Sequence, residues 1–406
     1  MGPLEGIRIL DMTSVLMGPY ATQLMGDLGA DVVKVEPPEG DIVRRIGPGR
    51  SPGMGGMFIT GNRSKRSIVL DLKRAAGREA MLRLAATADV LITNVRPLAM
   101  ERLGLGYEAV AAVNPAIVYV ALVGYGQDGP MAAAPAYDDL IQGATGLAAL
   151  GAAASGEAPR YAPVVMADRV VGLHAYGATL AALLSRARTG LGQRVDVPMF
   201  ETMASFVLGD HMSGLVYDPP LDDGGYARLL APDRRPYETR DGHVCVLIYT
   251  DAQWRRFFTL VGRAEMVDDP RFANHGERTR HIRAIYAEVA EIIRTRSTAE
   301  WLEVLREADI PAAPMNSIHE LLDDPHLEAV GFFETVEHPT EGRIRSMRVP
   351  TVWSGTPAIP ERLAPGLGEH GAEILAESGW SADEIAALQA DGALVLPPAV
   401  PPVERP

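Results

Sequence analysis

The amino-acid sequence predicts an α/β protein that has a large domain with a mainly parallel sheet and a second, smaller α+β domain. Short apolar runs alternate with amphipathic helical segments from residue 7 to about residue 215, a pattern that is typical of βαβ units. Residues 216–236 are rich in Pro, Asp and Gly, and hairpin and helix signals follow them. A chain of 406 residues is long enough to form two cores.

The first βαβ unit is expected within residues 7–36. The apolar run Ile7–Leu10 and the segment Asp31–Glu36 predict two strands. Pro19 suits the first turn of the helix between them, and Gly29 suits its C-terminal end. The loop that follows the first strand then lies at the carboxyl edge of a parallel sheet, where doubly wound sheets bind their ligands.

The same patterns predict the later elements. In the large domain, we expect strands at 67–72, 89–92, 117–123 and 193–197, and helices at 75–87, 97–103, 137–150 and 199–215. After the linker, Asp241-Gly242 predicts a hairpin of 237–239 and 243–249. Helices are expected from 251, over 276–295, from the capping box that starts at 297, and near 370–377 and 381–390, with a hairpin at 332–336 and 343–349 and a proline-rich tail.

These elements predict a discontinuous large domain. Its N-terminal part is 1–215, followed by the linker 216–236 and the small domain 237–325. A returning linker and hairpin, 326–350, leads to the C-terminal part, 351–406.

Asp168 lies where an extended run is expected to become a helix. Residues 164–166 predict a short strand. The helix after them is expected to bury one face, formed by apolar residues at three- and four-residue spacing: Val170, Leu173, Gly177, Leu180, Ala181 and Leu184. Asp168 would then precede the helix, where free N–H groups and the helix dipole favour an ionised carboxylate. A structural N-cap is the commonest role of such a residue, and a reactive carboxylate is the alternative.

Composition excludes several classes of function. The net charge of -14 argues against binding to nucleic acid or an anionic membrane. No apolar run approaches the roughly 18 residues of a spanning helix, and no signal peptide is visible, so a cytoplasmic protein is expected. Cys245 is the single cysteine, and the histidines lack metal-site spacing, so no metal is expected.

Positive charge is concentrated near the N-terminus. The three lysines, Lys34, Lys65 and Lys73, lie in the first 73 residues together with six arginines. Such a cluster is suited to a compact polyanion such as a nucleotide-like cofactor, and a solvated face explains it equally well. The sequence contains no G-x-G-x-x-G in a strand-to-helix context, no P-loop and no G-x-S-x-G elbow. The residues alone therefore leave the reaction open.

The order and spacing of several motifs resemble those of the family III CoA-transferases, the CaiB/BaiF group. The matching stretches are PLEGIRILDMTSVLMGPYATQLMGDLGADVVKVEPPEGDIVR, NRSKRSIVLDLK, ADVLITNVRP, GYGQDGP, MADRVVGLHAYGATLAALLSRARTGLGQRVDV and PGLGEH. The resemblance implies a Rossmann-like large domain, coenzyme A as part of the substrate, no metal, and a homodimer of two interlinked chains.

The resemblance also implies a reaction and a nucleophile. Asp168 occupies the position of the aspartate that attacks an acyl-CoA thioester in this family. The attack gives a mixed anhydride, and the released thiolate then forms an aspartyl-CoA thioester that passes CoA to an acceptor acid. Helix N–H groups are expected to keep Asp168 ionised and to stabilise the oxyanion.

Further site residues are implied by position in the family motifs. Those expected to contact CoA or the reacting end are Val15, Leu16, Leu70, Lys73, Asn94, Val95, Arg102, Tyr137 and Met199.

Two departures from the family pattern limit the choice of reaction. Leu16 stands where formyl-CoA transferases have Gln, and residues 248–254 (IYTDAQW) replace their glycine-rich lid, which disfavours oxalate and formate as substrates. Related α-methylacyl-CoA racemases have His at the position of Tyr137, and a phenol is a poor proton carrier at neutral pH. Racemisation is the second hypothesis, and a CoA-binding protein without catalysis is the third.

Overall fold

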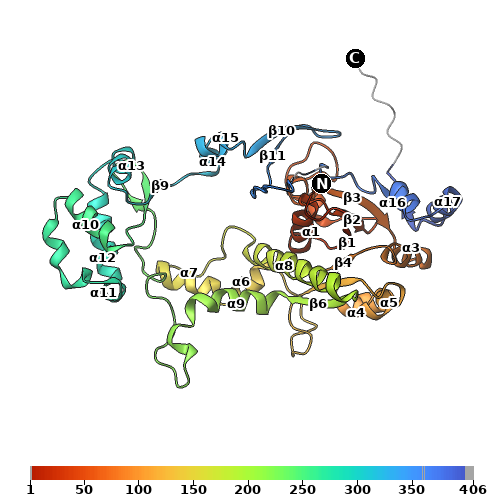
Figure 1. Ribbon diagram of the computed structural model, residues 1–406, viewed down its shortest axis with the longest axis horizontal. Coiled ribbons are helices and arrows are strands. Elements are labelled where there is room, and N and C mark those ends of the chain that lie inside the picture. The colour runs from red at the N-terminus through yellow and green to blue at the C-terminus, as the bar shows by residue number, and fades with distance from the viewer. Residues whose placement is uncertain (1, 359, 361, 398–406) are drawn as a thin grey trace, which may run out of the picture. The chain divides into compact units, whose positions relative to one another are not determined.

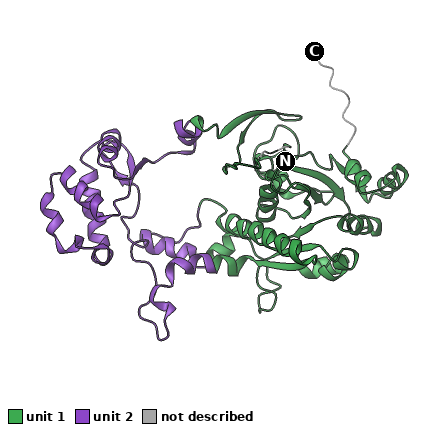
Figure 2. Cartoon of the chain, in the orientation of Figure 1, with its two compact units in different colours: residues 1–144, 163–204, 328–406 green, residues 145–162, 205–327 purple. Residues whose placement is uncertain are grey.

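The computed structural model describes residues 2–358, 360 and 362–397. The chain forms two compact units (Figure 2). The large unit comprises Met1–Ala144, Pro163–Ala204 and Glu328–Pro406, and the small unit comprises Thr145–Ala162 and Ser205–Leu327.

A seven-stranded sheet forms the centre of the large unit in the described part of the chain, with the order β12-β3-β2-β1-β4-β5-β6. Neighbouring strands are parallel except for the pair β12 and β3. The predicted α/β fold with a mainly parallel sheet is therefore confirmed. The strands are β1 (Arg8–Met12), β2 (Asp31–Glu36), β3 (Lys65–Leu70), β4 (Val90–Thr93), β5 (Val118–Val123), β6 (Gln193–Pro198) and β12 (Leu394–Val395).

Helices cover both faces of this sheet (Figure 1). On one face, α1 packs against β1, β2 and α8, and α8 also contacts β5 and β6. The helices of the large unit are α1 (Met17–Asp27), α2 (Gly56–Gly61), α3 (Ala75–Ala85), α4 (Pro97–Arg102), α5 (Tyr107–Val113), α6 (Asp138–Ala144), α8 (Met166–Thr189), α16 (Gly371–Glu377) and α17 (Ala382–Asp391). Two helices, α9 (Met199–His211) and α15 (Pro325–Ala329), cross the boundaries between the units.

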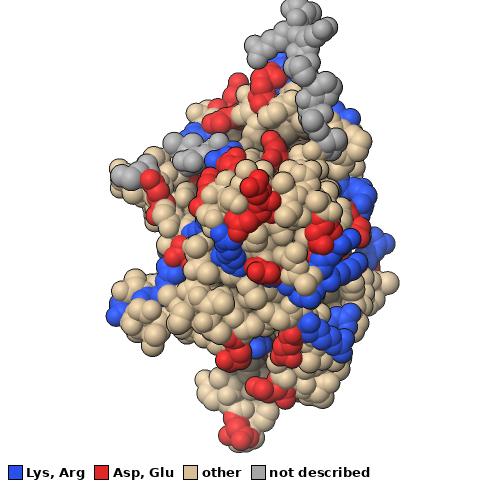
Figure 3. Space-filling model, turned by 90° about the vertical axis from the view of Figure 1, so that its right-hand side faces the viewer, with Lys and Arg blue, Asp and Glu red and all other residues tan. Residues whose placement is uncertain are grey.

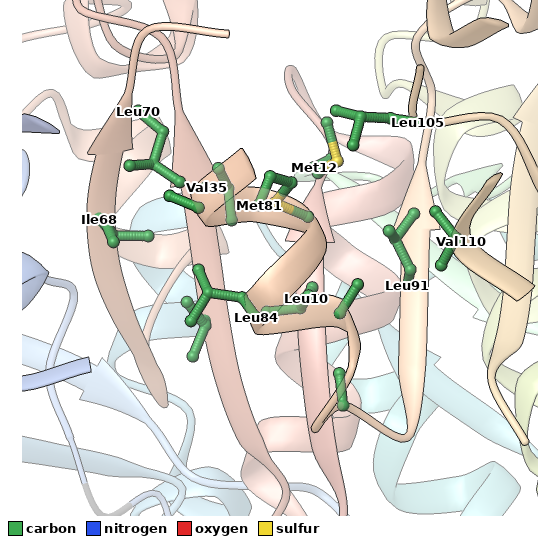
Figure 4. Packing of buried hydrophobic residues seen from close by; sticks show 14 of the residues in the cluster. Leu10, Met12, Val35, Ile68, Leu70, Met81, Leu84, Leu91, Leu105 and Val110 are labelled. Atoms are coloured by element: carbon green, nitrogen blue, oxygen red, sulfur yellow. The ribbon is translucent and has the colours of Figure 1, made fainter. Parts of the chain in front are cut away.

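The opposite face of the sheet carries the main hydrophobic core. Leu10 pairs in register with Val33 and Leu91, so apolar side chains of adjacent strands form a row. Met81 and Leu84 of α3 pack over the row (Figure 4). Side chains alternate between the two faces of a strand, so Leu10 and Val33 point to the face that α3 covers, and their neighbours in the chain point to the other face.

The face under α1 carries buried charges instead. Lys34 Nζ lies 2.9 Å from Asp41 Oδ2, and Lys65 Nζ lies 3.0 Å from Asp11 Oδ2, all four side chains being 0% exposed. Burial is tolerated because each charge has a partner of opposite sign. The predicted basic patch is thus wrong for both lysines, because they are buried and form ion pairs inside the large unit. On the face drawn in Figure 3, acidic and basic side chains are interspersed.

The small unit has its own aromatic core. Trp254, Phe258 and Phe272 contact one another with ring centroids 4.7 to 5.6 Å apart. The predicted hairpin is confirmed, since Tyr237 pairs with Val244, and the capping box at Ser297 is present. The unit contains α7 (Leu147–Ser155), β7 (Tyr237–Glu238), β8 (His243–Val246), α10 (Asp251–Leu260), α11 (His275–Arg280), α12 (Ile282–Ile293), α13 (Thr298–Glu307), β9 (Ala312–Pro314) and α14 (Ile318–Leu322).

Several predicted boundaries are wrong. The expected helix 137–150 is two helices, α6 and α7, because Gly146 adopts a left-handed conformation between them. The expected helix 276–295 is also divided, into α11 and α12, at His281. The predicted hairpin near 332–349 is present as β10 (Phe333–His338) and β11 (Gly342–Met347). Residues 398–406 of the predicted proline-rich tail lie outside the described residues.

The long helix α8 differs most from its prediction. It begins at Met166, so the strand predicted at 164–166 is absent. The predicted buried face is largely exposed, with Leu173 50% and Leu184 63% exposed. Small residues make the contact with α1 instead: a Cβ on Gly172 would lie 2.8 Å from the Met17 carbonyl oxygen. The helices approach so closely that large side chains cannot fit between them.

None of the described helices is both long enough and apolar enough to cross a membrane.

Candidate active site

Two loops meet at the carboxyl edge of the sheet, where the strand order reverses between β1 and β4. The Ser14 N–H donates to Asn94 Oδ1 over 3.0 Å, and Asn94 Nδ2 donates to the Ser14 carbonyl over 2.9 Å. In doubly wound sheets, ligands bind at this switch point.

The loop after β1 has a strained backbone that hydrogen bonds to buried side chains hold in place. Val15 has a φ of 70°, which is rare for a β-branched residue. The Val15 N–H donates to Asp41 Oδ1 over 3.1 Å, while Lys34 Nζ donates to the Thr13 carbonyl over 3.0 Å. The buried pair Lys34 and Asp41 therefore fixes the shape of this loop.

A first cavity, here called the reaction cavity, has a volume of about 280 Å³ and opens between these loops and α8. Among the predicted site residues, it brings together Val15, Asn94, Tyr137, Asp168 and Met199. Its other lining residues are Ser14, Met17, Arg96, Leu122, Gly124, Ala134, Pro135, Ala136 and Asp138.

A second cavity, here called the strand-end cavity, has a volume of about 480 Å³. Three of the predicted site residues line it, namely Leu70, Lys73 and Val95, and Lys73 is exposed. Ser14 lines both cavities, so they adjoin at the switch point. An elongated ligand can therefore place one end in each cavity.

Two predicted residues line neither cavity. Leu16 is 5% exposed and precedes α1, and Arg102 is exposed at the end of α4. Sequence reasoning missed Arg96 and Asp138. Arg96 follows the end of β4, where a cation can meet an anionic ligand, and Asp138 directly follows Tyr137. Within the described residues, the structure gives the exposed Arg96 side chain no ion pair.

Asp168 is the third residue of α8 rather than the residue before it. Its N–H donates to Asp138 Oδ1 over 3.1 Å. This amide is therefore not free to stabilise an oxyanion, contrary to the expectation from the sequence. Burial and the Asp138 carboxylate raise the pKa of Asp168 from 3.8 to about 7, while Arg169 acts in the opposite direction. The expectation that the helix start keeps Asp168 ionised is therefore wrong, because burial and a like charge outweigh the dipole.

This geometry suits covalent or acid-base chemistry by a carboxylate. A carboxyl group that titrates near neutrality is a better nucleophile when ionised than one with an ordinary pKa. Tyr137 is 68% exposed at the mouth of the same cavity. Among the described residues, no group of three or more His, Cys, Asp or Glu side chains is placed to hold a metal ion.

Comparison with known proteins identifies the kind of enzyme. Residues 4–371 match the sequence profile of CoA-transferase family III. The chain belongs to CoA-transferase family III. This family III CoA-transferase is 36% identical over 390 residues to the succinate–glutarate CoA-transferase of Agrobacterium fabrum, covering 92% of this chain and 95% of the relative. It is 31% identical over 377 residues to the human succinyl-CoA:glutarate CoA-transferase, covering 92% and 86%.

Solved structures agree with the family assignment. A CAIB/BAIF family protein from Brucella suis superimposes on this CoA-transferase with a TM-score of 0.78 and 32% identity, covering 93% of this chain and 99% of the other. The two cavities at the switch point thus belong to an enzyme whose substrates are CoA thioesters.

Proposed function

We propose that the enzyme transfers CoA from an acyl-CoA to a carboxylic acid, with Asp168 as the nucleophile. The observation that carries this proposal is the position of Asp168. It lines the reaction cavity, which adjoins the strand-end cavity at Ser14. The nucleotide part of CoA would lie in the strand-end cavity, near Leu70, Lys73 and Val95. The thioester would then reach the Asp168 carboxylate.

The proposed reaction exchanges acyl groups without water. The Asp168 carboxylate attacks the thioester carbonyl, the C–S bond breaks, and a mixed anhydride and CoA thiolate form. The thiolate attacks the aspartyl carbonyl, which gives an aspartyl-CoA thioester and releases the first acid. The acceptor carboxylate attacks this thioester, and the thiolate then takes the acceptor's acyl group and frees Asp168. The covalent intermediates replace one difficult exchange by a series of easier steps.

We propose short dicarboxylic acids as the acyl groups. One relative is named for succinate and glutarate, and another for succinyl-CoA and glutarate. Among the described residues, Arg96 is the one Lys or Arg in the lining of the reaction cavity, and it supplies a positive charge for an anionic group. Leu16 and residues 248–254 differ from formyl-CoA transferases, which argues against formate and oxalate.

The test is trapping of the covalent enzyme. Incubation with succinyl-CoA and hydroxylamine is expected to give a hydroxamate at Asp168, located by peptide mass spectrometry. Asp168→Asn is expected to bind CoA but to lose exchange by on the order of 10⁴-fold, because an amide forms no anhydride. Asp139→Asn, which removes an exposed carboxylate two positions from Tyr137, is the matched control. Exchange by Asp168→Asn at the rate of this control would exclude the proposal.

Racemisation has a separate test. In place of the racemase histidine, this chain has Tyr137, so the α-proton of a bound acyl-CoA is expected to exchange with deuterated solvent far more slowly than acyl groups turn over. Exchange at the turnover rate would favour the racemase hypothesis.

We also propose a cytoplasmic homodimer. The exposed leucines Leu173 and Leu184 on α8 provide apolar surface that a second chain would cover. Light scattering on dilution into the nanomolar range tests this, and an active monomer of 43.5 kDa would contradict it.

A further inference from the structure

We propose that Asp138 positions Asp168 for the transfer reaction, by accepting the amide hydrogen of Asp168 at the first turn of α8. The inference rests on the proposed role of Asp168 as nucleophile. Asp138 begins α6 and lines the same cavity as Asp168. Its Oδ1 accepts the Asp168 N–H over 3.1 Å, which fixes the backbone that carries the nucleophile.

The second oxygen of Asp138 is also held. Gln142 Nε2 donates to Asp138 Oδ2 over 2.6 Å and to the Val164 carbonyl over 3.4 Å. Gln142 is fully buried, one turn after Asp138 on α6. One carboxylate thus connects α6 to the start of α8, and its own orientation is set by a buried amide.

The start of α8 depends on this connection. Val165 occupies the N-cap position and makes no capping bond with its side chain. The first N–H groups of a helix have no partner within the helix, so an acceptor must come from elsewhere. Asp138 supplies it from a position 30 residues earlier in the chain.

The charge of Asp138 has a second, separable effect on the nucleophile. It acts with burial to raise the pKa of Asp168, whereas Arg169 on α8 lowers it. Arg96 from the loop after β4 and Tyr137 before α6 line the same cavity. Removal of the Asp138 charge leaves the positive groups in place, so the pKa of Asp168 is expected to fall.

Two substitutions separate the hydrogen bond from the charge. Asp138→Asn keeps an oxygen acceptor for the Asp168 N–H and removes the charge. Asp138→Ala removes both. In the full-length enzyme with succinyl-CoA and glutarate, Asp138→Asn is expected to move the acid limb of kcat/KM to lower pH and to keep its kcat at pH 8.5 within about threefold. Asp138→Ala is expected to show the same shift with a kcat lower by on the order of 100-fold and little change in KM, as for a misplaced reacting group.

Asp139→Asn is the matched control, because it removes the adjacent exposed carboxylate and is expected to leave both the acid limb and kcat unchanged. A kcat of Asp138→Ala at pH 8.5 within about threefold of wild type would overturn the inference, whether or not its acid limb moves. If Asp138→Ala does not fold, Asp138→Ser takes its place, because serine suits the start of α6 and its shorter side chain moves the acceptor away from the Asp168 N–H. A kcat at pH 8.5 well below that of Asp138→Asn supports the inference, and an equal kcat overturns it. Failure of the proposed function is distinct, since it would appear as exchange by Asp168→Asn.

Discussion

Asn94 and Ser14 exchange two hydrogen bonds across the switch point of the sheet, 3.0 Å from the Ser14 N–H to Asn94 Oδ1 and 2.9 Å from Asn94 Nδ2 to the Ser14 carbonyl. These hydrogen bonds join the loop after β1 to the loop after β4 at the place where the two cavities meet. Asn94 was predicted as a residue that contacts CoA, and its contacts indicate that it also shapes the loop on which CoA would lie.

The first prediction follows from this pair. Asn94→Ala removes both hydrogen bonds, so the loop that carries Ser14 is expected to become less well positioned. We expect KM for succinyl-CoA to rise about tenfold, equivalent to about 1.4 kcal/mol, with a smaller change in kcat. Steady-state kinetics measure this. Asn114→Ala serves as a comparison, because the Asn114 side chain donates to the Ala85 and Ala88 carbonyls before the start of β4, whereas Asn94 follows the end of that strand. An unchanged KM would show that the pair does not control the loop.

The second prediction concerns pH dependence. Because the pKa of Asp168 is raised to about 7 and the ionised form is the nucleophile, kcat/KM is expected to increase about tenfold per pH unit below pH 7 and to level off above it. Initial rates between pH 5 and pH 9, at subsaturating succinyl-CoA, measure the limb. A profile that is flat down to pH 5 would mean that Asp168 ionises with an ordinary pKa.

The third prediction concerns stability at the same residue. A carboxyl group with a raised pKa in the folded state binds its proton more tightly there than in the unfolded chain, so its cost to folding grows from about pH 4 to about pH 7 and stays constant above. Asp168→Asn is therefore expected to raise Tm at pH 8 by about 2 °C or more, since 1 kcal/mol shifts the Tm of a domain of about 150–250 residues by about 2–4 °C. The gain should disappear towards pH 4. Calorimetry at both pH values measures it, and equal Tm values at pH 8 would contradict the prediction.

The fourth prediction uses the contact between α1 and α8. In Gly172→Ala, the added methyl group would lie 2.8 Å from the Met17 carbonyl oxygen, so α8 must move away from α1. We expect a loss of about 1–3 kcal/mol in stability and a lower kcat, since Asp168 is one turn earlier on α8. Gly151→Ala in α7 is the matched control, because no other part of the described chain lies within 4 Å of the added Cβ, and it is expected to be neutral or stabilising. Wild-type kcat and stability in Gly172→Ala would show that the helices separate without consequence.

The fifth prediction concerns the buried ion pairs under α1. Burial alone would raise the pKa of Asp11, yet Lys65 and Lys34 together with two hydroxyl donors lower it to about 2. Asp11→Asn leaves Lys65 buried beside a neutral group, and a loss of about 3–5 kcal/mol is expected. Urea unfolding measures the loss. Glu337→Gln, in an exposed pair with Arg343 at 3.8 Å, is expected to change stability by less than about 0.5 kcal/mol.

The sequence predicted those parts of the fold whose pattern is local. The strands around Leu10 and Val33, the Asp241-Gly242 hairpin and the capping box at Ser297 each depend on neighbours in the chain. The face of α8 could not be predicted in the same way. Large apolar residues normally mark a buried face, but here the close approach to α1 requires Gly172, and Leu173 and Leu184 are exposed.

In the candidate site, too, the features that depend on local sequence were predicted and those that depend on distant residues were not. The position of Asp168 in the wall of a cavity follows from its motif, and the strand ends place Val15 and Asn94 nearby. The contact between Asp138 and Asp168 joins residues 30 positions apart, so no local pattern reports it. For Lys34 and Lys65, a ligand site and a solvated face were the two alternatives, and both are wrong because composition cannot distinguish an exposed charge from one paired inside the fold.

The short strand β12 has a consequence for how the enzyme is made. Leu394 pairs with Leu70, and the Asp71 N–H donates to the Ala393 carbonyl over 2.8 Å, beside residues that line the strand-end cavity. The chain is synthesised from its N-terminus, so β3 is complete long before β12 leaves the ribosome. Until then the edge of β3 is open to other chains, which is the condition under which sheets aggregate. In the described part of the chain, β12 therefore covers the edge of strands that are made first, and a nascent chain that stops before residue 394 would leave the edge of β3 unpaired.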